Sequence, residues 1–173
     1  MPVVRPLCLI DPADARGFRV ADAYGYGPSL WVAPVLEEGA REREVALPRG
    51  RWIDVCTCER HEGGGEVTVQ TPLDQIPVFV REGSLLVTYP AEHVAAGLGD
   101  TPERERPLEA TLWGEPACGR AATNLADGTR LRWRAGTLAV DPERPVVLRH
   151  RAGVSPAPPD PVRKNRPTRE TRR

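Results

Sequence analysis

The chain has 173 residues, of which 40% are hydrophobic and 28% are charged, and its formal net charge is zero. This length and balance fit one globular domain of ordinary size or two small ones, and the chain is long enough to bury a hydrophobic core. No run of about 18 apolar residues occurs, so no transmembrane helix is expected. The 19 prolines and 16 glycines favour short elements joined by turns over long helices.

The four cysteines are expected to be free thiols. The first residues, MPVVRP, lack the basic stretch followed by an apolar stretch that marks a secretory signal. Without a sign of secretion, a disulfide framework is not expected of Cys8, Cys56, Cys58 and Cys118. The predicted location is therefore the cytoplasm.

The N-terminal residues argue against helix. Residues 1–16 contain Pro2, Pro6 and Pro12, and proline removes a backbone donor and restricts the residue before it. The sequence GYGP at residues 25–28 predicts a turn.

From residue 29 to residue 88 the pattern is that of short strands. The apolar run at residues 29–36 predicts a buried strand, with Pro34 tolerated at an edge or a bulge. Alternation of polar and apolar residues, or a short apolar run, predicts five more strands, at residues 42–47, 51–55, 66–70, 76–80 and 84–88. Strands that recur about every ten residues are typical of a β-sandwich.

The second half contains another β segment. Residues 91–98 have the length of one or two helical turns, and residues 99–106 are typical of a linker. Asp127-Gly128 is a hairpin signal between two strand candidates. The strand candidates of this half are residues 108–113, 121–125, 130–134, 137–140 and 146–148.

The chain ends in a basic, proline-rich stretch with almost no large apolar residue. Residues 154–173 hold six basic and two acidic residues, so this stretch carries +4 and residues 1–153 carry −4. Such a composition cannot offset the entropy of ordering, and we expect disorder from residue 151 onward. The mildly acidic remainder argues against a nucleic-acid surface.

No pair of carboxylates stands out as a glycosidase-type acid and nucleophile, which would lie about 5–10 Å apart. Asp54 follows a tryptophan on a predicted strand, and Asp74 lies within the sequence PLDQIP. The ordinary interpretation of both is a turn or edge residue that caps backbone donors. No catalytic residue is predicted.

Cys56 and Cys58 are the nearest approach to a metal motif, because residues two apart share one face of a strand. His61 follows three residues later, and Cys8, Cys118, His93 and His150 are scattered along the chain. Structural zinc uses two ligand pairs at defined spacings, and one pair favours incidental thiols. No metal site and no cofactor are predicted. Gly63–Gly65 lacks the Lys-Ser/Thr of a phosphate-binding loop and predicts a flexible turn.

The four tryptophans could in principle stack on sugars. Trp31 lies in the apolar run and is expected in the core. Trp52 and Trp133 alternate with polar neighbours and could face either way, and Trp113 ends a predicted strand. Packing in a core or between domains is the favoured interpretation over a carbohydrate platform.

Five blocks in order resemble glycoside hydrolase family 31. MPVVRPL at residues 1–7 resembles the end of that family's last barrel unit, and LWVAPV at residues 30–35 resembles the entry into its first β-domain. LPRGRWID at residues 47–54, the glycines at 63–64 and PLDQIPVFVREGS at residues 72–84 follow. More weakly, LADGT at residues 125–129 is similar to the family's distal β-domain. The sequence departs from the pattern at Cys56 and Cys58, which replace an aromatic residue and a glycine.

The resemblance implies an all-β fold: a β-sandwich, a smaller distal β-domain and a disordered tail. It divides the chain into a remnant of the last barrel unit with a linker (1–23), a proximal β-sandwich (24–90), a linker (91–106), a distal β-domain (107–150) and a tail (151–173). Because Met1 falls inside a sequence motif that resembles the family's last barrel unit, we hypothesise a truncated, split or misannotated gene.

The resemblance also implies a function. Family members are retaining α-glycosidases that need no metal, and their two catalytic aspartates lie upstream, on a (β/α)8 barrel. The chain is therefore expected to be an inactive C-terminal fragment whose partner is a missing or separately encoded barrel. The alternative is a non-catalytic β-sandwich module that binds carbohydrate or a partner subunit. An exposed flat stripe of tryptophan would favour sugar binding, and an apolar patch near residues 1–16 would favour a missing barrel.

Overall fold

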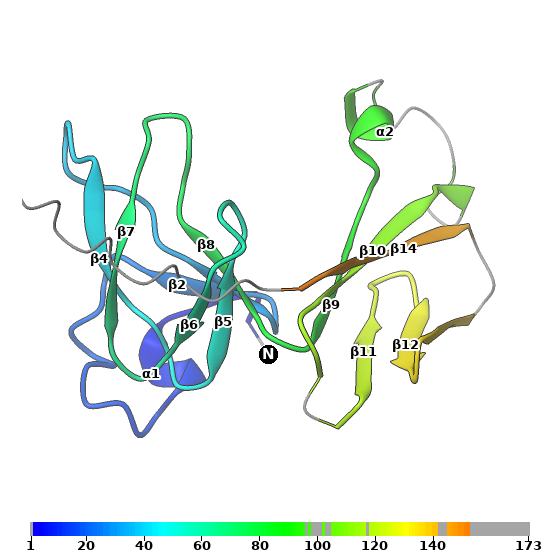
Figure 1. Cartoon of the computed structure of the whole chain (residues 1–173), viewed down its shortest axis with the longest axis horizontal. Helices are drawn as coiled ribbons and strands as arrows, with labels where there is room; N and C mark the ends of the chain where they lie inside the picture. The colour runs from blue at the N-terminus through cyan, green and yellow to red at the C-terminus, as the bar shows by residue number, and fades with distance from the viewer. Residues whose placement is uncertain are drawn as a thin grey trace, which may run out of the picture.

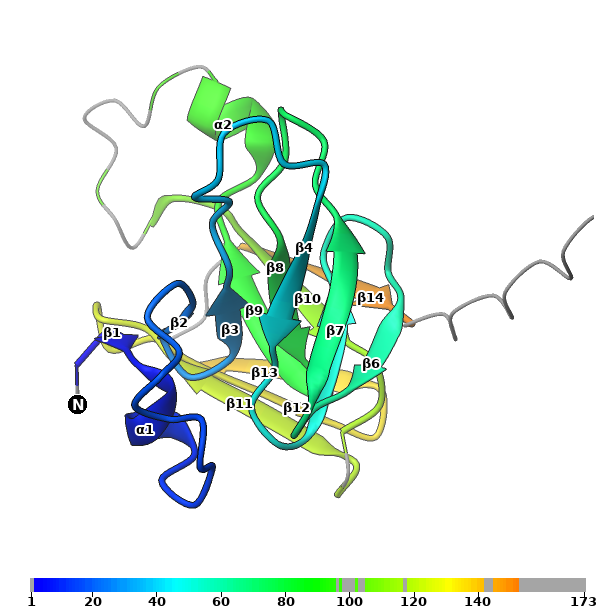
Figure 2. The ribbon, with the colours of Figure 1, turned by 90° about the vertical axis from the view of Figure 1, so that its left-hand side faces the viewer.

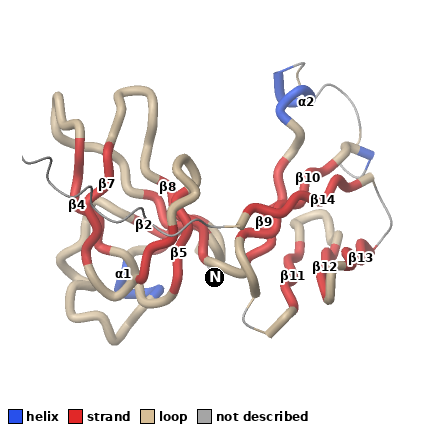
Figure 3. The backbone as a smooth tube through the Cα atoms, in the orientation of Figure 1, coloured by secondary structure: helices blue, strands red, loops and turns tan. Residues whose placement is uncertain are grey.

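The protein forms two β lobes that lie side by side (Figure 1). The computed structural model describes residues 2–95, 97, 102, 105–116, 118–141 and 145–152. Strands dominate these residues, and the helical segments are short (Figure 3). The predicted all-β class is confirmed. Neither α1 nor α2, the two α-helices of the described residues, has the length and hydropathy needed to cross a membrane.

The first lobe contains strands β1 to β8 and one short helix. Their bounds are β1 Val4–Arg5, α1 Leu7–Ile10, β2 Tyr24–Tyr26, β3 Leu30–Val32, β4 Glu42–Ala46, β5 Arg51–Asp54, β6 Arg60–Glu62, β7 Glu66–Gln70 and β8 Val78–Arg81. Six of these strands form an antiparallel sheet in the order β1-β2-β3-β8-β5-β6, and β4 pairs with β7 in a separate ribbon.

The β4–β7 ribbon and the six-stranded sheet make a sandwich. In Figure 2 the ribbon lies in front of the sheet. Its core draws on both layers and on the N-terminal segment. The buried members are Leu7, Ala23, Trp31, Ala33, Val45, Leu47, Trp52, Val69 and Phe79. The alternate spacing of apolar residues along the strands thus places large side chains between the two layers.

The centre of the six-stranded sheet, at β5 and β8, is buried on both faces, because side chains alternate along a strand. Trp52 and Phe79 point into the sandwich core. Their neighbours Ile53 and Val80 point the other way and pack with Trp113 of the second lobe, all three at most 4% exposed. Burial on both faces explains why β8 is a continuous apolar run instead of an alternating one.

The second lobe is a smaller two-layer structure. Its elements are β9 Ser84–Thr88, α2 Ala91–Ala95, β10 Leu108–Trp113, β11 Arg120–Asn124, β12 Arg130–Arg134, β13 Thr137–Asp141 and β14 Val146–Arg151. One sheet has the order β14-β10-β9 and the other β11-β12-β13. Between them lie the buried side chains of Leu85, Ala110, Leu112, Ala121 and Leu131.

Strand pairing crosses the domain boundary that was expected at residue 90. β9 lies within the range 24–90, yet it pairs antiparallel with β10. Of the expected linker 91–106, residues 91–95 form the predicted helical turn α2. The expected tail lies outside the described residues from residue 153 onward, and Arg151 ends β14.

The N-terminal segment differs most from expectation. Helix was not expected within residues 1–16, but Leu7–Ile10 form α1. Pro6 comes directly before this helix and has an extended backbone (φ −68°, ψ 166°). Proline is compatible with this position because the backbone N–H groups at the start of a helix have no partner within the helix, so the N–H that proline lacks is not needed. The predicted turn at residues 25–28 is likewise partly strand, since β2 runs through Tyr26.

Candidate functional site

The N-terminal segment is fixed to the first lobe by its own core residue. Leu7 is fully buried in the sandwich core, and Ile10 packs against that core. Gly25 on β2 allows this approach, because a Cβ there would stand 2.2 Å from Ile10 Cδ1. The segment is therefore packed on the sandwich as part of the first lobe.

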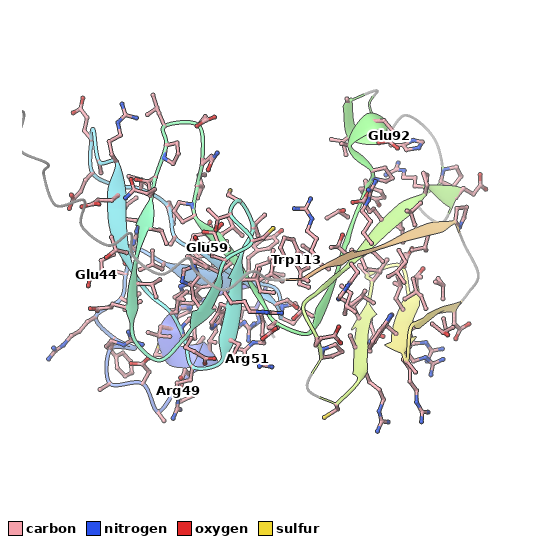
Figure 4. The ribbon with its side chains drawn as sticks, viewed as in Figure 1. Glu44, Arg49, Arg51, Glu59, Glu92 and Trp113 are labelled. Atoms are coloured by element: carbon pink, nitrogen blue, oxygen red, sulfur yellow. The ribbon has the colours of Figure 1, made fainter. Side chains whose placement is uncertain are left out.

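An ion pair adds a second anchor. Arg49 Nε donates to Asp11 Oδ2 at 2.7 Å, its backbone N–H donates to the same oxygen at 3.2 Å, and its Nη2 donates to Asp11 Oδ1. This paired geometry, chiefly the guanidinium hydrogen bonds, lowers the pKa of Asp11 to about 2. Arg49 lies in the turn between β4 and β5, so the pair ties the end of α1 to the sandwich; Figure 4 shows Arg49 beside α1.

Two further arginines hold the segment. Arg16 pairs with Asp14 at 2.6 Å and donates from Nη2 to the carbonyl of Leu47 at 3.0 Å. Arg5 donates from Nη2 to the carbonyl of Gly27 at 2.5 Å. These contacts span 31 and 22 residues of sequence, so they connect distant parts of the chain.

The outward side of this segment is apolar, and it is the candidate functional site. We define the N-terminal apolar surface as five side chains, each at least half exposed: Val3, Val4, Leu9, Phe18 and Tyr26. Val4 and Tyr26 are direct partners in the β1–β2 pair, so they share one face. Phe18 is 94% exposed and follows Gly17, where a Cβ would lie 3.0 Å from Cys8 of α1. The N-terminal segment thus presents apolar side chains to solvent.

The two carboxylates considered from sequence are separate from this surface. Asp54 Oδ1 accepts hydrogen bonds from the backbone N–H of Cys56 at 2.7 Å and of Thr57 at 3.0 Å. Its predicted role as a cap of backbone donors is confirmed. Asp74 is exposed in a turn next to Leu73.

Cys56 and Cys58 do not share a strand face, in contrast to the expectation. β5 ends at Asp54, whose carboxylate holds the following residues in a turn, and Cys58 has a positive φ of 60°. Burial raises the pKa of the Cys56 thiol, with a smaller contribution from the Asp54 charge. His61 instead stacks edge-on against Phe79, with 5.6 Å between ring centroids.

The remaining metal-type side chains lie apart. All four cysteines are free thiols, as predicted. Cys8 is in α1, His93 is exposed on α2, and His150 is on β14. Across the part of the chain that the structure describes, no group of three or more His, Cys, Asp or Glu side chains is placed to hold a metal ion.

The glycine run forms a tight turn instead of a phosphate cradle. Gly63 donates its N–H to the Gly50 carbonyl at 2.7 Å, and Gly64 donates to the Leu47 carbonyl at 3.0 Å. A Cβ on Gly63 would lie 1.9 Å from the Pro48 carbonyl oxygen. Glycine is thus required at position 63 by close backbone packing, and Gly64 has a positive φ of 93°.

Three of the four tryptophans are packing residues. Trp31 is fully buried, Trp52 is 2% exposed and donates to the Pro48 carbonyl at 2.8 Å, and Trp113 is 4% exposed between the lobes (Figure 4). Arg81 and Arg151 lie over the Trp52 and Trp113 rings, at 4.8 and 5.4 Å. Trp133 differs, since it is partly exposed and lines a cavity.

The surface cavities formed by described residues include two of similar volume. One, of about 330 Å³, lies along β4 and is lined by Asp22, Glu37, Glu42 and Glu44 together with Arg43. The other, of about 290 Å³, lies in the second lobe. The first is a site of ion pairing, because Arg43 Nη2 lies 2.6 Å from Asp22 Oδ2 and Gln70 donates to Glu42 at 3.2 Å.

Comparison with known proteins connects both lobes to one group of enzymes. Residues 1–86 match the sequence model described as the glycosyl hydrolase family 31 C-terminal domain. The sulfoquinovosidase of Agrobacterium fabrum is 40% identical over 85 residues, which are 49% of this chain and 13% of that protein.

Solved structures extend the similarity into the second lobe. A family 31 dextranase of Flavobacterium johnsoniae, complexed with isomaltotriose, is 27% identical with a TM-score of 0.66, over 81% of this chain and 19% of its own. The family 31 α-xylosidase of Xanthomonas citri, at 24% identity and a TM-score of 0.68, covers 87% of this chain and 18% of its own, and shows the shared fold. The chain thus spans less than a fifth of each of these relatives. Through residues 1–86, it belongs to glycosyl hydrolase family 31, as that family's C-terminal domain.

Proposed function

We propose that this chain is the non-catalytic β-rich end of a retaining α-glycosidase of family 31, and that its first lobe docks on the (β/α)8 barrel that cleaves the glycosidic bond. The relatives named sulfoquinovosidase and dextranase support an activity on O-glycosyl bonds. The barrel, and not these lobes, would select the sugar. A reducing compartment such as the cytoplasm suits the four free thiols.

The N-terminal apolar surface carries this proposal. Its five exposed side chains sit on a segment whose inner side is part of the core and whose loops are held by Arg49 and Arg16. Val4 and Tyr26 are paired on neighbouring strands, and five large apolar side chains exposed within residues 3–26 exceed the single exposed residues that are normal on a solvated surface. The barrel is expected on this side because the segment is the one that resembles the family's last barrel unit.

The described carboxylates support a non-catalytic role. A glycosidase needs an acid and a nucleophile or base facing one cleft, with the pKa of the acid raised by burial. The acids around the cavity along β4 are exposed, and Asp22 is paired with Arg43. Asp11, the carboxyl with the largest change, has its pKa lowered, which is opposite to what a general acid requires.

The test is hydrolysis by the purified chain. We expect no release of nitrophenol from nitrophenyl α-glucoside or α-xyloside above the buffer background. Turnover that rises in proportion to the concentration of the chain would contradict the proposal.

The cavity beside Trp133 favours a second candidate, a module that binds carbohydrate, alone or with a partner subunit. The two functions are compatible within one protein, because the cavity and the N-terminal apolar surface lie on different lobes.

A further inference from the structure

We propose that the cavity at the open edge of the second lobe is a binding site for a single neutral sugar residue. The choice of a carbohydrate rests on the proposed function, whereas the site itself rests on the arrangement of its side chains. The cavity has a volume of about 290 Å³, at the lower end of small-molecule sites, which suits one pyranose ring better than a long oligosaccharide.

The floor of the cavity is an opening in the lobe's core. Leu112 of β10 is 2% exposed and belongs to that core. His150 of β14 is its direct partner in the parallel β10–β14 pair, and Leu148 lies two residues earlier on the same face. The apolar face of this sheet thus continues from the buried Leu112 to the partly exposed Leu148 on the edge strand β14.

Trp133 faces this floor from the opposite sheet. It comes from β12 and packs in part against the lobe's core, yet it also lines the cavity. The turn after β12 leaves the mouth open, because a Cβ at Gly136 would find no atom within 4 Å. An indole beside a shallow opening can stack on the C–H face of a sugar ring, which is its most apolar side.

The rim is polar. His150 lies at 3.3 Å from the carbonyl of Gly114, to which its Nε2–H donates, and at 3.7 Å from Glu115 Oε1. In the neutral ring Nδ1 is then an acceptor. Glu115 has a side chain that is 73% exposed, so its oxygens can accept from hydroxyl groups.

Charge favours a neutral ligand over an anion. Arg149 also borders the cavity, but its Nε lies 2.8 Å from Glu109 Oε2, so its charge is already paired. Glu115 adds a negative charge at the rim, which would repel a carboxylate or sulfonate. A neutral sugar can donate hydrogen bonds from its hydroxyl groups to Glu115 and His150, and it can place its apolar face against Trp133. It therefore matches each of these three side chains.

The experiment is saturation-transfer NMR of the full chain with isomaltotriose. We expect transfer from protein to glucosyl ring protons. Trp133→Ala should weaken binding about fivefold to tenfold, as for loss of one aromatic contact, and Trp133→Phe should restore most of it. Glu115→Gln should weaken binding without affecting the fold, because its side chain is largely exposed. Arg132→Ala is the matched control, since Arg132 is exposed on the same strand and borders no part of the cavity.

Two results would overturn the proposal. One is the absence of transfer to isomaltotriose with the unaltered chain. The other is equal binding by the Trp133→Ala, Glu115→Gln and Arg132→Ala variants. Neither result bears on docking of the first lobe, which depends on residues of that lobe alone.

Discussion

Asp11 and Arg49 form the ion pair that closes the N-terminal segment onto the sandwich. Because the pKa of Asp11 is lowered to about 2 in the folded chain, from about 3.9 in an unfolded one, the pair stabilises the fold above pH 4. That contribution is lost as the pH falls through the folded pKa, near 2.

We therefore expect Asp11→Asn to lower the free energy of unfolding at pH 7, and the difference from the unaltered chain to shrink between about pH 4 and pH 2. Urea unfolding at pH 7, 4 and 2.5 measures it. Asp74→Asn, at an exposed turn, is the control and should change little at any pH. An Asp11→Asn effect of equal size at all three values would refute the assignment.

Local contacts of single residues were predictable, and distant ones were not. The capping role of Asp54 was predictable because its partners lie two and three residues away. Arg49 lies 38 residues from Asp11, and no spacing in a single sequence connects them. Trp133 likewise alternates with polar residues, and its place in a cavity depends on β10 and β14, from other parts of the chain.

Strand periodicity predicted most elements because strands of five or six residues are long enough to show alternation or an apolar run. β4, β7, β9, β10 and β12 lie where alternation or apolar runs indicated. The elements that were missed, β1, β2, β6 and α1, have two to four residues each. So few residues show no period, and their structure depends on partners brought from elsewhere.

The helix α1 offers a comparison between its two sides. Leu7 is fully buried and Leu9 is 58% exposed. Leu7→Ala should therefore lower the free energy of unfolding by about 2–5 kcal/mol, as for other core leucines, and Leu9→Ala by less than about 0.5 kcal/mol. Denaturant unfolding of the two variants checks this. Equal effects would mean that the segment is not part of the core.

The two lobes share buried structure and are expected to unfold together. Ile53, Val80 and Trp113 form one cluster across the junction. Glu82, between β8 and β9, lies 2.8 Å from Arg51 Nε and 3.1 Å from Arg60 Nε. Its side chain is 4% exposed, and Gly114 of the second lobe closes over it, since a Cβ there would lie 2.5 Å from Glu82 Cγ.

Calorimetry should consequently show one transition, with equal calorimetric and van't Hoff enthalpies. Trp113→Ala should lower its midpoint, since loss of a buried tryptophan costs about 3–5 kcal/mol. Two separate transitions in the unaltered chain would show that the junction does not couple the lobes.

The central claim is that the first lobe is a docking domain, and a chimera tests it. Residues 1–86 would replace the aligned segment of the Agrobacterium fabrum sulfoquinovosidase, and thermal stability and hydrolysis would be measured. We choose Phe18→Lys, at 94% exposure, and Thr68→Lys, exposed on the outer side of β7, as the matched control.

In the isolated chain, neither substitution should change stability by more than about 0.5 kcal/mol, since both side chains face solvent. In the chimera, Phe18→Lys should lower the melting temperature and the activity, and Thr68→Lys should lower neither. If Phe18→Lys and Thr68→Lys behave alike in an active chimera, the N-terminal apolar surface does not face the barrel, and the account is wrong.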